Sequence, residues 1–314
     1  MNPSHRCLLV AALLVSPALF GAPRIERLVE KTFAAPAPGT LRAETSGGEI
    51  RVTSSPDRTV KITARQRIRA SSEAEADEAL KRLELVMEQQ GADVVLRAKY
   101  PQKPFGFGWG SWPPVNVDFI VAVPADFAAD LRTSGGPITV ADLGGELHAR
   151  TSGGGIKLGR IGGKVDARTS GGSITLDGAG GPVELETSGG NITVGRVAGR
   201  ATLGTSGGGI RIESVDGALR ANSSGGSIRA AIRGPLKDEC VLSTSGGSVK
   251  VNVDRTAALR LDASTSGGGV DAEGLTLTLE KGSSGRSRLA GNVNGGGPLL
   301  KLRSSGGGIT VAAQ

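Results

Sequence analysis

The sequence predicts an all-β protein, a right-handed parallel β-solenoid with two short strands per coil of about 18–21 residues and a small α+β insertion that carries one helix near the N-terminus. Three observations predict this fold. A T-S-G-G motif recurs at regular spacing, apolar residues alternate between the motifs, and glycine supplies 50 of the 314 residues while aromatic residues supply only 3%. Glycine at this level with regular apolar spacing is typical of a turn-rich repeat rather than of a disordered chain.

The motif sets the period of the repeat. T-S-G-G or S-S-G-G returns every 18 residues over six consecutive copies and then at wider steps, with starts at Thr133, Thr151, Thr169, Thr187, Thr205, Ser223, Thr244, Thr265 and Ser304, and a degenerate copy at Ser283. A further copy at Thr45 stands apart from the array. Such a fixed period is the sequence signature of a solenoid.

Each coil contains two stretches of alternating apolar residues. In the coil that starts at Thr169, Ile174 and Leu176 alternate, followed by Val183 and Leu185. A period of two predicts strands with one buried face, and equivalent strands stack in register only when they run in the same direction. A parallel crossover is right-handed in about 98% of cases, which gives the predicted hand. We expect the Gly-Gly pair to adopt positive φ at the corners, and the threonine hydroxyls to form a ladder with one another.

An insertion of α+β character separates the first coil from the array. It is expected to hold a strand over Val60–Ile68, a helix over Ser72–Gln90 that opens on the capping box S-E-A-E, and strands over Asp93–Lys99 and Val115–Val123. Ala76, Leu80, Leu83 and Met87 would form the apolar face of the helix. Residues 23–132 are therefore predicted to be the first coil plus a cap, and residues 133–314 the repeat array.

The N-terminus has the layout of a signal peptide. Residues 1–22 combine a basic start, a short apolar run and small residues, with cleavage after Ala18 or Ala22. The protein is therefore expected to be exported, to the periplasm or to the cell surface and medium. The apolar run is shorter than the roughly 20 residues that a membrane-spanning helix needs, and no later segment approaches that length.

The residue inventory points away from catalysis. Without the signal peptide, His148 is the only histidine and Cys240 the only cysteine, and alternation places His148 outward and Cys240 inward. We therefore predict no catalytic residue, no metal site and no cofactor, and a protein that is not an enzyme.

Two surface features are candidates for binding. The first is a stripe of basic and threonine side chains on the outward face of the first sheet, whose cations are Arg51, Lys157, Arg211, Arg229 and Lys250. Together with a formal net charge of +7, it favours an anionic glycan or lipopolysaccharide, the alternative being an ordinary solvated sheet face. The second is an aromatic loop with Phe105, Phe107, Trp109 and Trp112, which fits either a binding tip or a local core.

The C-terminal coil, which begins at Ser304, is expected to leave an unpaired parallel edge. An open edge is a template for a further strand, so end-to-end self-association is a second hypothesis for a partner, beside an envelope protein or glycan. No nucleic-acid partner is expected.

The T-S-G-G-x-I-x-V coils, the first coil cut off by a helix-bearing insertion, and the strand VDFIVAVP before the array resemble the bacterial β-strand-repeat family labelled "putative adhesin", a domain of unknown function. The resemblance implies a cell-envelope location and a solenoid, and it brings no catalytic residues. The main functional hypothesis is a non-catalytic adhesion or binding module for a glycan or envelope partner. A self-associating envelope scaffold and a polysaccharide-active β-helix enzyme stay open as alternatives.

Overall fold

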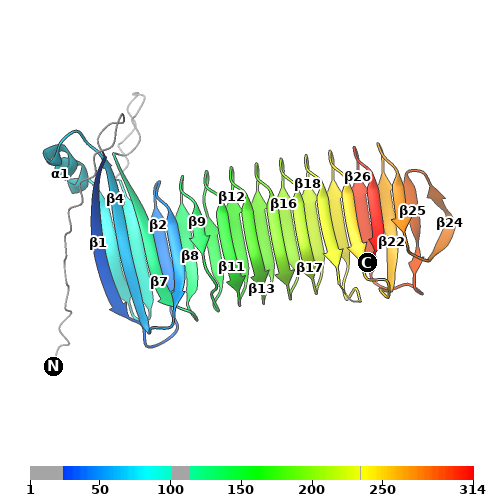
Figure 1. Cartoon of the computed structure of the whole chain (residues 1–314), viewed down its shortest axis with the longest axis horizontal. Helices are drawn as coiled ribbons and strands as arrows, with labels where there is room; N and C mark the ends of the chain where they lie inside the picture. The colour runs from blue at the N-terminus through cyan, green and yellow to red at the C-terminus, as the bar shows by residue number, and fades with distance from the viewer. Residues whose placement is uncertain (1–23, 101–113, 234) are drawn as a thin grey trace. The chain divides into compact units, whose positions relative to one another are not determined.

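The computed structural model describes residues 24–100, 114–233 and 235–314. The chain divides into two compact units, Met1–Ser152 and Gly153–Gln314, which we call the N-terminal and the C-terminal unit. In both units each coil sends one strand to each of two sheets, A and B, and successive coils stack as parallel strands (Figure 1). The predicted parallel β-solenoid with one short helix near the N-terminus is confirmed.

In the C-terminal unit both sheets consist mainly of parallel strands. In spatial order, sheet A contains β11 (Ile156–Ile161), β13 (Ile174–Ala179), β15 (Ile192–Val197), β17 (Ile210–Val215), β19 (Ile228–Ile232), β21 (Val249–Val253), β27 (Ile309–Ala313) and β23 (Val270–Glu273). Sheet B contains β12 (Val165–Thr169), β14 (Val183–Thr187), β16 (Ala201–Thr205), β18 (Leu219–Ser223), β20 (Cys240–Thr244), β26 (Leu299–Ser304), β22 (Leu259–Thr265), β25 (Arg288–Val293) and β24 (Leu277–Gly285).

The N-terminal unit has the same two-sheet layout. Its sheet A contains β1 (Arg24–Ala34), β4 (Thr59–Arg69), β7 (Val115–Pro124), β3 (Ile50–Ser55) and β9 (Ile138–Val140). Its sheet B contains β5 (Glu84–Gln90), β6 (Asp93–Lys99), β2 (Thr40–Thr45), β8 (Ala128–Thr133) and β10 (Leu147–Arg150), and helix α1 (Glu73–Lys81) connects β4 to β5.

The core lies between the two sheets of each unit. The four predicted inward residues of the coil at Thr169, which are Ile174, Leu176, Val183 and Leu185, are all at most 3% exposed. Equivalent residues pair directly in neighbouring strands, as Ile174 does with Ile192. Because the core contains little aromatic volume, its packing rests on stacked rows of branched aliphatic side chains.

The corners are held by a side-chain bridge between coils. The Thr187 hydroxyl donates to the carbonyl of Gly172 in the preceding coil at 2.8 Å and accepts from the N–H of Gly190 in its own coil at 3.3 Å. The same pair of bonds recurs at Thr205 and at Ser223. The expected ladder between threonine hydroxyls is therefore wrong, because these hydroxyls bond to backbone groups and not to one another.

The second glycine of the motif is required because the backbone of the adjacent coil lies too close for a side chain, and not because of its φ angle. A Cβ on Gly190 would lie 2.2 Å from the Gly172 carbonyl oxygen, and one on Gly208 would lie 2.0 Å from the oxygen of Gly190. The expectation of positive φ at these corners is wrong. Among the described residues, the glycines with positive φ lie outside the motif, at Gly91, Gly274, Gly295 and Gly296.

The helix is shorter than expected. Ser72 caps it as predicted, with its hydroxyl accepting from the Glu75 N–H at 3.2 Å, but α1 ends at Lys81. Residues 84–90 instead form β5, antiparallel to β6, so Met87 is a strand residue opposite Leu96. Gly91 lies in the turn between these strands with φ of 65°. Leu83, Leu85 and Met87 also alternate with a period of two, which fits a strand, and pairing with β6 makes this stretch a strand.

At the start of the solenoid, chain order and stacking order differ. The coil formed by β6 and β7 follows the β2–β3 coil in the sequence, yet it stacks on its outer side, pairing β6 with β2 and β7 with β3. Antiparallel strands then complete both sheets, β4 and β1 on sheet A and β5 on sheet B. Strand β1 was not anticipated from the sequence.

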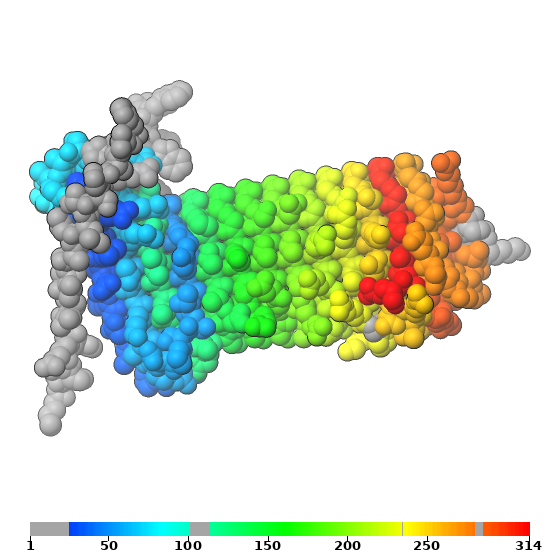
Figure 2. Space-filling view, viewed as in Figure 1, coloured from blue at the N-terminus to red at the C-terminus, as the bar shows by residue number. Residues whose placement is uncertain are grey.

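At the far end of the C-terminal unit, chain order and stacking order also differ. The last coil, β26 and β27, is inserted between the β20–β21 coil and the β22–β23 coil (Figures 1 and 2, red). Ser304 accordingly donates to the carbonyl of Gly247, while Thr265 donates to that of Gly307. The prediction of an open edge at the last coil is wrong, because both of its strands have neighbours on either side. The β24–β25 hairpin follows β22 instead.

The corner contact predicts a sharp difference between two glycines. Gly190→Ala places a methyl group on the Gly172 carbonyl and displaces the Thr187 hydroxyl, so we expect a loss of about 3 kcal/mol in the free energy of unfolding. Gly204→Ala is the matched control, because its Cβ would meet only the Glu186 side chain at 4.0 Å. Urea denaturation checks both variants, and equal midpoints for the two would contradict the corner assignment.

The inserted last coil predicts where a truncation acts. Removing residues 298–314 takes away the strands that join β22 and β23 to the rest of the unit. Because β27 is the strand partner of β23, whereas β22 also pairs with β25, we expect β23 to lose its protection against hydrogen exchange, measured by mass spectrometry, and β22 to keep part of its own. Retained protection in β23 would contradict this expectation.

Candidate binding surface on sheet A

In the C-terminal unit the outward stripe predicted from the sequence is a continuous row across sheet A. The row takes one side chain from each strand, always three residues after the second glycine of the motif in the regular coils. Direct pairing between neighbouring strands places its members in the order Lys157, Thr175, Thr193, Arg211, Arg229, Lys250, Thr310 and Asp271. Four of the five predicted basic residues therefore lie in one line, and three of them are consecutive.

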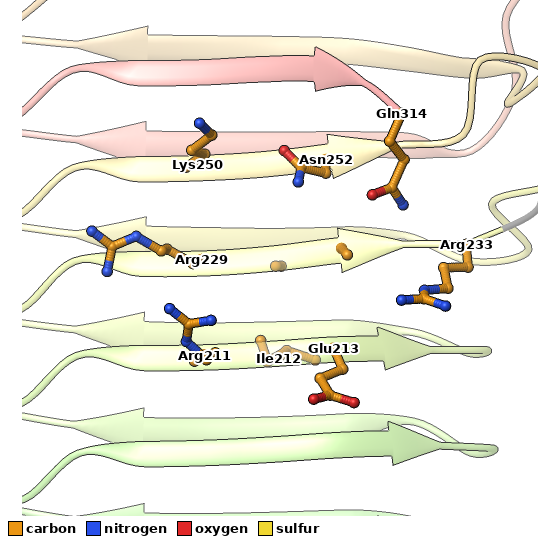
Figure 3. A pocket seen from close by; sticks show the side chains of 10 residues that line it. Arg211, Ile212, Glu213, Arg229, Arg233, Lys250, Asn252 and Gln314 are labelled. Atoms are coloured by element: carbon orange, nitrogen blue, oxygen red, sulfur yellow. The ribbon is translucent and has the colours of Figure 1, made fainter.

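The three consecutive cations border a hollow of about 480 Å³ (Figure 3). Arg211, Arg229 and Lys250 line it along one side, and Arg233 adds a fourth cation from the end of β19. The remaining side chains that line it are small or polar, apart from the sheet residue Ile212: they are Glu213, Ala230, Ala231, Asn252 and Gln314. Ala231 pairs with Asn252, and its short side chain leaves room between the longer ones.

The charges in this hollow are not balanced. Arg211 lies directly opposite Arg229, and Arg229 opposite Lys250. Like charges in these positions repel, by about 1 kcal/mol per pair in water. Among the described residues no ion pair joins any of the four cations to an acid. An anion bound here would relieve the repulsion.

The outward face of sheet B in the same unit is different. Arg168 is surrounded by acids, with Asp166 at 3.1 Å, Glu184 at 2.5 Å and Glu186 at 3.1 Å. Arg303 likewise pairs with Asp262. Arg168 and Arg303 of sheet B are thus paired with acids, unlike Arg211, Arg229 and Lys250 on sheet A.

Arg51, the fifth predicted basic residue, lies on β3 in the N-terminal unit. Its guanidinium contacts the Glu49 carboxylate at 2.8 Å. On the same sheet, the buried Asp118 carboxylate accepts from the Glu49 N–H at 2.9 Å and from Arg67 at 2.7 Å. Arg51 is therefore paired with an acid, and within its own unit it lies opposite Thr139, its neighbour in the predicted stripe.

The aromatic candidates Phe105, Phe107, Trp109 and Trp112 lie outside the described residues, so their interpretation as a binding tip or a local core stays a prediction.

The residues with catalytic potential occupy the predicted positions. Cys240 is 2% exposed and pairs with Leu219, so it fills an inward position of the core. Burial raises the pKa of its thiol to about 11. His148 is half-buried on the outward side of β10. In the described part of the chain, no group of three or more His, Cys, Asp or Glu side chains is arranged to hold a metal ion.

No helix of the described residues has the length and apolar character needed to cross a membrane.

The chain was compared with known proteins. The model of the family described as Toastrack DUF4097 matches residues 41–312. No curated protein matches. Among solved structures, one called "putative adhesin" from Bacteroides fragilis is 12% identical with a TM-score of 0.42, covering 90% of this chain and 96% of its own. A "putative lipid binding protein" from Parabacteroides distasonis is 14% identical, with a TM-score of 0.40 and the same two coverages. A "putative adhesin" from that organism is 13% identical, with a TM-score of 0.34 and coverages of 91% and 97%.

The environment of Cys240 predicts an unreactive thiol. Because its pKa of about 11 and its burial keep it protonated and covered, alkylation by iodoacetamide at pH 8 should be slow in the folded protein and fast in denaturant. Peptide mass spectrometry measures the modified fraction at Cys240. Equal rates in the two conditions would place the thiol at the surface.

Proposed function

The chain belongs to the Toastrack DUF4097 family, and we propose that it acts as a non-catalytic binding module of the cell envelope whose ligand is an anionic glycan. The observation that carries this proposal is the hollow on sheet A, where Arg211, Arg229 and Lys250 lie in register, form no ion pair with a described acid, and outnumber the single acid Glu213. A sheet maintained only for solubility would interleave charges of both signs, as the face of sheet B does.

Binding rather than chemistry is favoured by the shape of the surface. The hollow contains a single acid, Glu213, whereas glycoside hydrolysis needs two carboxyl groups that flank the scissile bond. The hollow has no cysteine, histidine, serine or threonine among its lining residues, so it offers no nucleophile with a base beside it. The regular stack of strands is suited instead to contact with an extended partner.

An exported location is part of the proposal. Residues 1–22 have the three-part layout of a secretory signal, which supports transfer out of the cytoplasm. Envelope glycans are the abundant extended polyanions of that compartment, and a row of cations on a flat sheet complements them.

The test is binding to immobilised anionic polysaccharides, with two variants of equal net charge. Arg211→Gln, Arg229→Gln and Lys250→Gln together remove the row of cations, and we expect affinity to fall by at least about tenfold. The control combines Lys164→Gln, Arg200→Gln and Arg220→Gln, three exposed cations on or beside the strands of sheet B. It should bind as the wild type does, and added salt should weaken wild-type binding.

Two results would overturn the proposal. The first is absence of binding to every anionic polysaccharide tested. The second is an equal loss in both triple variants, which would assign binding to net charge alone and not to the hollow on sheet A.

A further inference from the structure

The row on sheet A defines a direction as well as a charge. Its members come from successive strands, so the row runs across the strands, along the stacking axis of the coils. Neighbouring strands lie about 4.8 Å apart, so the positive charges repeat at nearly equal steps in a line. A ligand that meets all three cations at once must present several negative charges within a short, extended length.

Hydroxyl groups extend the row beyond the cations. Thr193 precedes Arg211 and Thr175 precedes Thr193, while Thr310 follows Lys250. A threonine hydroxyl both donates and accepts hydrogen bonds, which suits the hydroxyl groups of a sugar. From Thr175 to Thr310 the row covers six strands, a span of about 24 Å.

The row ends on a negative charge. Asp271 on β23 is the outward neighbour of Thr310, at the edge of the sheet. A polyanion that continued past Thr310 would meet this carboxylate and be repelled. The favourable part of the row is therefore bounded on this side.

The surroundings of the row argue against other anions. A lipid needs an apolar surface beside the charges, and among the described residues the large apolar side chains that are exposed are Leu28 and Leu279, neither of which lines the hollow. A single-stranded nucleic acid needs aromatic faces for its bases, and no aromatic side chain lines the hollow. An extended sugar chain requires neither.

We propose that the glycan ligand is a linear polyuronate, with a carboxylate on every successive sugar, lying along the coil axis from Thr175 to Thr310. This inference rests on the proposed function and specifies the class of glycan. Such a polymer presents a carboxylate on every sugar, so the long side chains of Arg211, Arg229 and Lys250 can each reach one within a short stretch of the polymer. A polymer charged on alternate sugars presents half as many carboxylates over the same number of sugars.

The experiment compares polygalacturonate, charged on every sugar, with hyaluronate, charged on every second sugar, and uncharged dextran, at equal concentration of carboxylate where present. Polygalacturonate should bind several-fold more tightly than hyaluronate, and dextran should not bind. Equal affinity for the two acidic polymers overturns the inference and leaves the proposed function standing. Binding to neither acidic polymer, when other anionic glycans bind, overturns the inference as well, whereas no binding to any anionic glycan overturns the proposed function.

A second test uses a variant that should bind polygalacturonate more tightly, because a variant that failed to fold would lose affinity and not gain it. Thr193→Lys lengthens the row to four consecutive cations, because Thr193 pairs with Arg211. We expect binding of polygalacturonate to tighten by about two- to fivefold. Thr202→Lys adds the same charge on the outward side of β16 in sheet B and is the control. The inference fails if the two variants gain equally, or if Thr193→Lys gains nothing.

Discussion

The contact on which the rest of the structure depends is the corner bridge from a threonine or serine hydroxyl to the glycine carbonyl of the adjacent coil. It brings two turns of backbone so close that a single methyl group does not fit at Gly190. Because the bridge repeats at the T-S-G-G corners, the sheet A strands that follow this motif in the C-terminal unit all start at the same offset from it. This one contact therefore sets the register of the inward aliphatic rows and of the outward row of cations.

The regular coils could be predicted from the sequence because period and alternation are local properties. Ile174 and Leu176 are buried as expected, and Cys240 occupies the position of Leu219. The order of the coils at the ends could not be predicted. The coils at Thr265 and Ser304 carry the same motif and similar alternation of apolar residues, so either could stack on the coil at Thr244. Only pairing across the whole unit distinguishes them.

The candidate surface was partly visible in advance. The spacing of Arg211, Arg229 and Lys250 places them on one face, and the structure adds that they are direct neighbours. Alternation could not show which charges pair. Arg51 forms an ion pair with Glu49, whereas Arg211 forms none with a described acid, although Glu213 lines the same hollow. The hollow also depends on the short side chain of Ala231 next to Asn252, a relation between strands that linear spacing does not reveal.

The displaced coils have a consequence for how such a chain can change length. Between β11 and β19 the order of the coils along the chain is also their order in the stack. A duplicated coil of 18 residues could therefore be added there with its corner bridge and its row of aliphatic side chains preserved. At the ends the two orders differ, and an added coil would separate strands that now pair, such as β20 and β26. Duplication of coils can therefore lengthen this protein only in the middle of the stack. The row of cations on sheet A can lengthen only there as well.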